Sequence, residues 1–94
     1  MSGKAEMKTV CVIGAGRWGR NHIRTLSELG SLGGVVELDE ASRTLIKTQY
    51  GNIGVFADIK DAMGFDGYVV ATPAETHYPI ASFLLRNKKR AFQV

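Results

Sequence analysis

Residues 10–19 read Val-Cys-Val-Ile-Gly-Ala-Gly-Arg-Trp-Gly, and this stretch decides the fold. It begins within a nearly continuous apolar run, residues 8–13, which is typical of a strand buried on both faces of a parallel sheet. Gly14, Gly16 and Gly19 follow in the pattern Gly-x-Gly-x-x-Gly, and helical spacing of apolar residues begins directly after them. A strand, a glycine turn and a helix in this order predict the first βα unit of an α/β domain.

Each glycine of the turn has its own physical role. Gly14 permits the tight turn from strand to helix, and Gly16 lacks a Cβ, so that a pyrophosphate can approach the backbone. Gly19 allows the helix to pack closely against the sheet. The free N–H groups and the positive dipole end of that helix then face the phosphates. The turn therefore predicts a binding site for the pyrophosphate of a dinucleotide, NAD or NADP.

Short β-branched runs and longer helix-like segments alternate along the rest of the chain. Strands are expected at residues 8–13, 34–38, 53–56, 68–71 and 91–94. Helices are expected from the glycine turn to residue 30, over 40–50, from 58 to 63 or 64, and from 75 or 76 to 87. Nine apolar helix positions are expected to face inward: Trp18, Ile23, Leu26, Leu29, Leu45, Ile46, Ile80, Phe83 and Leu84.

This alternation, with short connections, predicts right-handed crossovers and a parallel sheet with helices on both faces. The fold class is therefore α/β, a Rossmann-type, doubly wound, five-stranded sheet with strand order 3-2-1-4-5. With 94 residues the chain has room for one domain, residues 8–94, after a flexible lead-in at residues 1–7.

Composition excludes several other classes. No stretch reaches the roughly 18–20 continuous apolar residues of a membrane span, so no membrane association is expected. The single cysteine, Cys11, lies in a predicted strand and is interpreted as a small buried apolar residue, which fits a cytoplasmic protein. The net charge is +3, and much of the excess is in residues 86–90. A solvated helix end explains this cluster better than a nucleic-acid site, so no nucleic-acid partner is expected.

Two acidic residues compete for the ribose of the dinucleotide. An acidic side chain is expected at the end of the second strand, roughly 20 residues after the glycine turn. Glu37 follows Gly19 by 18 positions and Asp39 by 20. Glu37 is favoured for the two ribose hydroxyls, because Asp39 is better explained as a helix cap. A carboxylate there repels a 2′-phosphate and favours NAD over NADP, although Arg43 or Arg17 could offset the repulsion.

A second loop follows the fourth strand and reads Thr-Pro-Ala-Glu-Thr-His, residues 72–77. In a doubly wound sheet, ligands lie outside the carboxyl ends of strands one and four, so this loop borders the same crevice as the glycine turn. Thr72 has a hydroxyl and a backbone that could contact the cofactor, and Pro73 would stiffen the loop beside it.

Together, the two motifs resemble a known family. Val-Ile-Gly-Ala-Gly-Arg-Trp-Gly-Arg-Asn-His (12–22) and Val-Val-Ala-Thr-Pro-Ala-Glu-Thr-His-Tyr (69–78) look like the N-terminal domain of the glucose–fructose oxidoreductase / inositol dehydrogenase / MocA family. The sugar and nucleotide-sugar branch is the most similar. The resemblance covers nearly all of the chain after Lys8.

The resemblance implies a role for each matching position. The three glycines would hold the pyrophosphate, with the backbone of Arg17 and Trp18 alongside, and Glu37 would bind the ribose. Thr72 and Pro73 would lie against the nicotinamide side of the cofactor. His77 would start the helix below it, and a residue satisfied by local hydrogen bonds is favoured there over a catalytic one. No metal is implied.

Family members continue into a Glu-Lys-Pro motif, whose lysine works in proton transfer, and then into a substrate-binding domain. Here the printed chain ends at Gln93-Val94, so we expect it to bind the dinucleotide without turning over a substrate. The alternative is a non-enzymatic nucleotide-sensing or interaction module on the same fold. Residues 90–94 are expected to form an exposed sheet edge that supports self-association.

Overall fold

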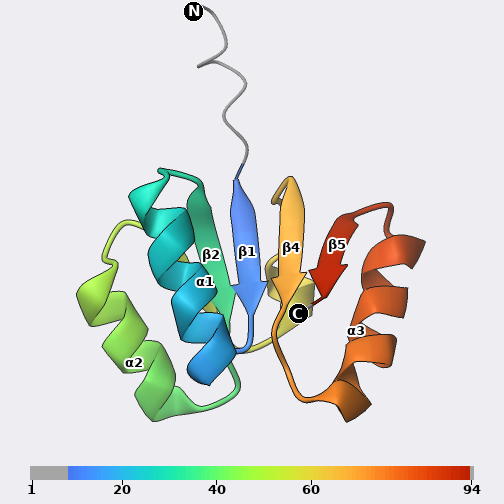
Figure 1. Cartoon of the computed structure of the whole chain (residues 1–94), viewed down its shortest axis with the longest axis horizontal. Coiled ribbons are helices and arrows are strands. Elements are labelled where there is room, and N and C mark those ends of the chain that lie inside the picture. The colour runs from blue at the N-terminus through green and yellow to red at the C-terminus, as the bar shows by residue number, and fades with distance from the viewer. Residues whose placement is uncertain (1–8, 94) are drawn as a thin grey trace, which may run out of the picture.

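The computed structural model describes residues 9–93, except for the side chains of residues 17–18, 74–78 and 92–93. The lead-in expected at residues 1–7 lies outside the described part, as does Val94. Strands and helices alternate along the chain (Figure 1). The elements are β1 (Val10–Ile13), α1 (Arg17–Glu28), β2 (Leu32–Val36), α2 (Glu40–Gln49), β3 (Gly54–Phe56), the 3-10 helix η2 (Ile59–Asp61), β4 (Gly67–Val70), α3 (Ala74–Arg86) and β5 (Arg90–Gln93).

The five strands form one parallel sheet in the order β3-β2-β1-β4-β5, which confirms the predicted fold class and strand order. Val12 in the centre of β1 lies opposite Val35 of β2 and Val69 of β4. The chain leaves β1 toward β2 on one side and enters β4 on the other. The labelled strands in Figure 1 all point toward the same edge, so their carboxyl ends meet where the connections diverge.

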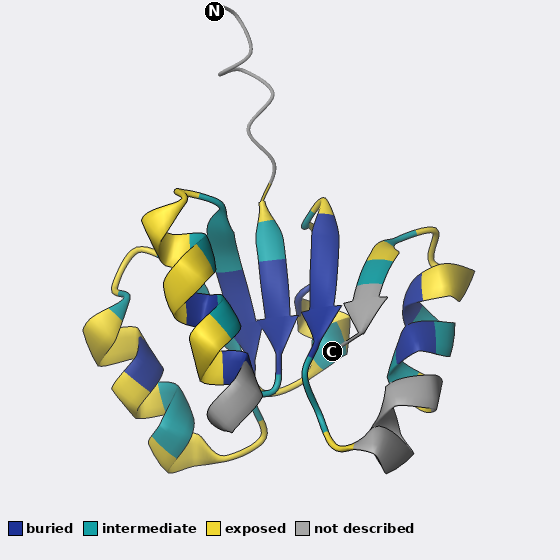
Figure 2. Cartoon of the chain, in the orientation of Figure 1, coloured by how far each residue is buried: buried dark blue, intermediate teal, exposed yellow. Residues whose placement is uncertain are grey.

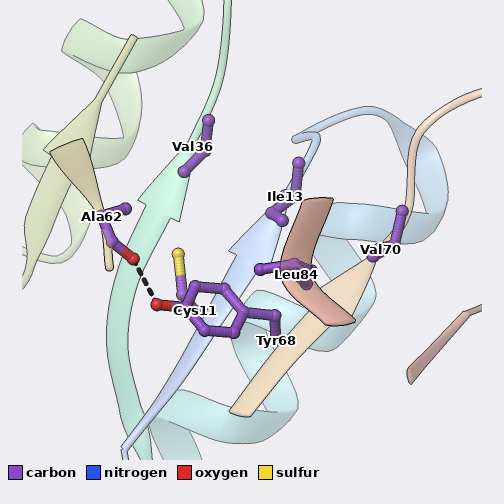
Figure 3. Close-up of a cluster of buried hydrophobic side chains, with 7 residues drawn as sticks. All are labelled: Cys11, Ile13, Val36, Ala62, Tyr68, Val70 and Leu84. Carbon is purple, nitrogen blue, oxygen red and sulfur yellow. Dashed lines mark hydrogen bonds between the residues drawn. The ribbon is translucent and has the colours of Figure 1, made fainter. Parts of the chain in front are cut away.

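Alternate strand residues fill two apolar clusters, one on each face of the sheet. Figure 2 shows that burial is concentrated in β1, β2 and β4, with exposed residues on the outer sides of the helices. The cluster under α1 and α2 contains Val12, Ala15, Ile23, Val35, Ile46 and Val69. The opposite cluster, drawn in Figure 3, contains Cys11, Ile13, Val36, Ala62, Tyr68, Val70 and Leu84.

The segment between β3 and β4 covers the sheet with aromatic rings. A helix was expected from residue 58 to 63 or 64, but only the short η2 forms there. The ring of Phe65 makes edge contacts with Phe56 and Tyr68, at centroid distances of 6.2 and 6.1 Å. It lies so close to β2 that a Cβ on Gly34 would be 2.6 Å from its Cζ. The glycine therefore makes room for the ring.

Tyr68 is fully buried, and its hydroxyl is satisfied by the same segment. The hydroxyl donates a hydrogen bond to the carbonyl oxygen of Ala62 (Figure 3) and accepts one from the backbone N–H of Phe65 at 3.3 Å. Burial raises the pKa of this phenol, although the N–H of Phe65 opposes that shift. The two hydrogen bonds join the loop before β4 to the core.

Three leucines do not lie where the apolar pattern placed them. Leu29 and Leu45, expected to face inward, are 68% and 53% exposed. The second strand, expected over residues 34–38, spans 32–36, because β1 ends at the glycine turn and its last pair is Ile13 with Val36. Leu38 therefore lies beyond the sheet and is 85% exposed.

The end of α3 carries a lysine in the left-handed region. Lys88 has φ of 59°, and its N–H bonds the carbonyl of Leu85 while the N–H of Lys89 bonds that of Leu84. This is the Schellman pattern, in which glycine is the usual residue. We expect Lys88→Gly to raise the free energy of unfolding by about 1 kcal/mol in urea titration, because glycine adopts this conformation without strain.

Lys88→Ala is the control, since it removes the charge but keeps the Cβ. An equal gain in the free energy of unfolding from both variants would show that loss of one positive charge among residues 86–90, and not the backbone conformation at residue 88, raises stability.

We expect the stability of the fold to decline at alkaline pH because of Cys11. It is a free, buried cysteine, as predicted, and burial raises the pKa of its thiol from 9.0 to about 12. The unfolded chain therefore loses the thiol proton first, and the stability due to the neutral thiol is lost as the pH rises from 9 toward 12. One thiol contributes a loss of about 1.4 kcal/mol per pH unit in this window.

Urea titrations at pH 8, 9, 10 and 11 should show a shallower decline for Cys11→Ala than for the wild type. Although the variant starts from a lower stability at pH 8 because of the cavity it creates, only the slopes are compared. Equal slopes of unfolding free energy against pH for the two proteins would contradict the assignment of this decline to Cys11.

Candidate functional site

A cleft of about 810 Å³ lies at the carboxyl ends of β1, β2 and β4. This is the position where doubly wound sheets bind their ligands. Its walls come from the glycine turn, the residues after β2, the start of η2, the loop after β4 and α3. They comprise Ile13, Gly14, Ala15, Gly16, Val36, Glu37, Leu38, Ala57, Asp58, Ile59, Ala71, Thr72, Pro73 and Ile80.

The glycine turn is held by close backbone contacts. Gly14 has φ of 98°, and a Cβ there would lie 3.0 Å from the carbonyl oxygen of Ala71. At Gly19 a Cβ would lie only 1.9 Å from the carbonyl oxygen of Gly14, so that α1 begins directly against the turn. The tight turn expected at Gly14 and the close packing expected at Gly19 thus correspond to short backbone contacts in the structure.

Gly16 differs, because a Cβ added there would meet nothing within 4 Å. Gly16 is exposed at the rim of the cleft and is the N-cap of α1, with no side-chain hydrogen bond to the helix start. The first helical bond runs from the N–H of Arg20 to its carbonyl, 2.9 Å away. The N–H groups before Arg20 have no partner within the helix, and such groups at a helix start are suited to bind an anion.

Glu37 connects this turn to the end of β2. Its Oε1 accepts a hydrogen bond from the backbone N–H of Ala15 at 2.7 Å, and its Oε2 accepts one from that of Asp39 at 2.9 Å. A carboxylate has about four acceptor positions, so each oxygen retains capacity for a ligand hydroxyl. The structure brings Glu37 and the glycine turn together, as the sequence predicted.

Asp39 caps a helix, the role that the sequence favoured for it. Its carboxylate accepts hydrogen bonds from the N–H and the hydroxyl of Ser42, both at 2.9 Å, and it is the N-cap of α2. The hydrogen bond from the Ser42 backbone lowers the pKa of Asp39, with a smaller contribution from the charge of Arg43. The interpretation of Asp39 as a cap is confirmed.

Thr72 and Pro73 lie on the wall opposite Glu37 along the sheet edge. The Oγ1 atom of Thr72 is buried and has no hydrogen-bond partner among the described residues. An orphaned hydroxyl beside a cleft is the arrangement expected where a ligand supplies the missing partner. Pro73 is exposed and forms the N-cap of α3.

Three of the residues singled out in the sequence have no described side chains. Arg17 and Trp18 form the first turn of α1, so their backbone N–H groups lie at the positive end of that helix. His77 lies in the first turn of α3. The positions of these side chains relative to the cleft lie outside the described part of the structure.

Sequence reasoning missed the wall formed by Leu38, Ala57, Asp58 and Ile59. The expected end of the third strand could have indicated this wall, because the carboxyl ends of parallel strands meet at the same sheet edge. In the structure β3 ends at Phe56, directly before residues 57–59 of this wall. The carboxylate of Asp58 accepts a hydrogen bond from the N–H of Lys60 at 2.9 Å, which fixes the start of η2 beside the cleft.

Residues 8–93 match the family model described as the GFO_IDH_MocA oxidoreductase family, NAD-binding Rossmann fold. The chain therefore belongs to this family and is an NAD-binding domain. Comparison with curated proteins gave no match. None of the helices described is long and apolar enough to cross a membrane.

Solved structures share this fold, and they include a nucleotide-sugar dehydrogenase and an inositol dehydrogenase. GenD2 from gentamicin A biosynthesis, in complex with NAD, is 31% identical, with a TM-score of 0.83 over 92% of this chain and 26% of its own. UDP-N-acetylglucosamine 3-dehydrogenase GnnA from Acidithiobacillus ferrooxidans is 20% identical, with a TM-score of 0.83 over 92% and 29%. Scyllo-inositol dehydrogenase from Lactobacillus casei is 22% identical, with a TM-score of 0.82 over 93% and 28%.

These coverages mean that the chain spans little more than a quarter of the length of each of these three structures. The two matches below 25% identity establish the fold only.

The glycine contacts predict that two alanine substitutions differ greatly in their effect on stability. Gly19→Ala places a methyl group against the backbone of Gly14, so we expect a loss of about 3 kcal/mol or more, or failure to fold. Gly16→Ala meets open space at φ of −75° and should unfold within about 0.5 kcal/mol of the wild type. Thermal and urea unfolding monitored by circular dichroism measure both, and equal losses would contradict the geometry.

Proposed function

We propose that this chain is the cofactor-binding part of an oxidoreductase that acts on a hydroxyl of a sugar or nucleotide sugar. One observation carries the cofactor site: a single cleft joins the open helix start at Gly16 to the carboxylate of Glu37. The substrate class rests on the names of the similar structures, which include a nucleotide-sugar dehydrogenase and an inositol dehydrogenase. Bound NAD would supply the hydride acceptor or donor.

In this proposal the pyrophosphate lies over Gly14 and Gly16 and is bound by the backbone N–H groups of Arg17 and Trp18. Gly19 acts indirectly, by letting α1 aim its N-terminus at the phosphates. Apart from Gly16 and its two chain neighbours, no described residue has an atom within 4 Å of the Gly16 Cβ position, and this open space supports the placement. A phosphate oxygen would occupy this open space beside Gly16.

Glu37 would bind the adenosine ribose through both hydroxyls. Its oxygens already accept one N–H each, so the carboxylate is oriented before the ligand arrives. A 2′-phosphate would bring like charge against this carboxylate, and the site therefore favours NAD over NADP. The exposed side chain of Leu38 and the side chain of Ile59, both in the cleft wall, would cover the adenine.

Thr72 and Pro73 would contact the nicotinamide half of the cofactor, and His77 would lie below them at the start of α3. The unpartnered Oγ1 of Thr72 supports this, because a bound ligand would provide its hydrogen-bond partner. Its neighbour Pro73 lies at the cleft and fixes the loop backbone at φ of −56°. None of these residues is assigned a catalytic role.

Calorimetric titration of NAD⁺ and NADH into the 94-residue chain tests the proposal. We expect saturable binding to the wild type and at least tenfold weaker binding to Gly16→Ala, because its methyl group occupies the pyrophosphate position. The unfolding temperature of Gly16→Ala should be unchanged, which separates loss of the site from loss of the fold. Wild-type protein that binds no cofactor at millimolar concentration would contradict the proposal.

A change at Glu37 tests the ribose assignment separately. Glu37→Gln keeps an acceptor oxygen for the N–H of Ala15 but removes the negative charge. We expect weaker NAD⁺ binding and stronger NADP⁺ binding, so that the ratio of the two affinities falls about tenfold or more. An unchanged ratio in the same titrations would show that Glu37 does not distinguish a 2′-hydroxyl from a 2′-phosphate.

The chain is also proposed to self-associate and to work in the cytoplasm. In the described sheet β5 pairs only with β4, and such an edge is a template for pairing with a second copy. The buried free thiol of Cys11 fits a reducing compartment. A clean monomer in sedimentation at high concentration would contradict the first proposal.

A further inference from the structure

The guanidinium of Arg43 reaches back from α2 to the end of β2. Its Nη1 donates hydrogen bonds to the carbonyl oxygens of Glu37 and Leu38, each at 2.8 Å. One guanidinium nitrogen carries two hydrogens, so both are used by these two bonds. A single side chain thereby connects two consecutive peptide groups immediately beyond the strand.

These two carbonyls lie just past the last residue of β2, Val36. The last sheet-like bond on this side runs from the N–H of Glu37 to the carbonyl of Phe56, at 2.9 Å. Beyond it the strand ladder gives the backbone no further partners, and carbonyls of this kind need a donor from elsewhere. Arg43 is that donor, and it fixes the two peptide planes that flank the Cα of Leu38, the first of which directly follows the Cα of Glu37.

The direction of the Glu37 side chain depends on the two planes beside its own Cα, one held by its N–H bond to Phe56 and the other by Arg43. Its carboxylate reaches two N–H groups, those of Ala15 and Asp39, that lie on different turns. Both bonds form only while the backbone at residues 37–38 holds its present conformation. A small rotation there would move the carboxylate away from the glycine turn.

We propose that Arg43 is a positioning residue that acts through Glu37 and sets the preference for NAD over NADP. This inference rests on the proposed function of the cleft. An arginine near the 2′ position of a ribose would ordinarily suggest binding of a 2′-phosphate. Here the arginine serves the opposite preference, because its Nη1 donors are bound to the backbone that presents the carboxylate.

The test measures the dissociation constants of NAD⁺ and NADP⁺ for wild type, Arg43→Met and Arg43→Lys. Arg43→Met should weaken NAD⁺ binding about tenfold and leave NADP⁺ binding unchanged or tighter, because the displaced carboxylate both loses the ribose and repels the phosphate less. Lysine also carries several donors on one nitrogen, so Arg43→Lys should recover most of the NAD⁺ affinity.

Arg24→Met is the matched control, since Arg24 is an exposed arginine of α1 that does not line this cleft. It should leave both constants unchanged. A fall in NADP⁺ affinity equal to or larger than that of NAD⁺ in Arg43→Met would overturn the inference and assign Arg43 to the phosphate.

A double-mutant cycle separates positioning from general destabilisation. If Arg43 acts through Glu37, Arg43→Met has no further effect on NAD⁺ affinity in the Glu37→Gln background. Additive losses would overturn the inference. Wild-type protein that binds neither cofactor would overturn the proposed function as well, whereas normal wild-type binding with an unchanged NAD⁺ to NADP⁺ ratio in Arg43→Met overturns only the role of Arg43.

Discussion

The approach of α1 to the glycine turn is the constraint on which the rest of the structure depends. A Cβ at Gly19 would lie 1.9 Å from the carbonyl oxygen of Gly14, so no side chain fits between the helix and the turn. This contact aims the N-terminus of α1 at the edge where β1 ends. If the helix were displaced by one methyl group, its free N–H groups would no longer converge with the other cleft residues.

The second constraint is the carboxylate that joins the first two βα turns. Glu37 holds the N–H of Ala15 on one turn and that of Asp39 on the other, while Arg43 holds the backbone beneath it. The same atoms therefore stabilise the protein and line the cleft, at the end where we propose that the ribose binds. In the proposed function, cofactor preference would follow from this local hydrogen-bond network in addition to the charge of Glu37.

Much of this could be predicted from the sequence because the deciding signals are local. The spacing of Gly14, Gly16 and Gly19 specifies a turn whose backbone geometry is nearly unique, and alternating strand and helix patterns specify a parallel order. The choice of Asp39 as the cap also followed from position alone. The role of Arg43 could not be predicted, because nothing in the spacing shows that its guanidinium turns back to the carbonyls of residues 37 and 38. Leu38 was misplaced for a related reason, since strand ends depend on the partner strand and not on the apolar run.

Amide chemical shifts of the ¹⁵N-labelled chain during titration with NAD⁺ test the central claim most directly. The account predicts saturating shifts for Ala15, Gly16 and Asp39, whose N–H groups lie on the glycine turn or bind Glu37, and no shifts for Lys88 and Lys89 at the far end of α3. Shifts confined to the basic residues at the end of α3, with none at the glycine turn, would contradict it.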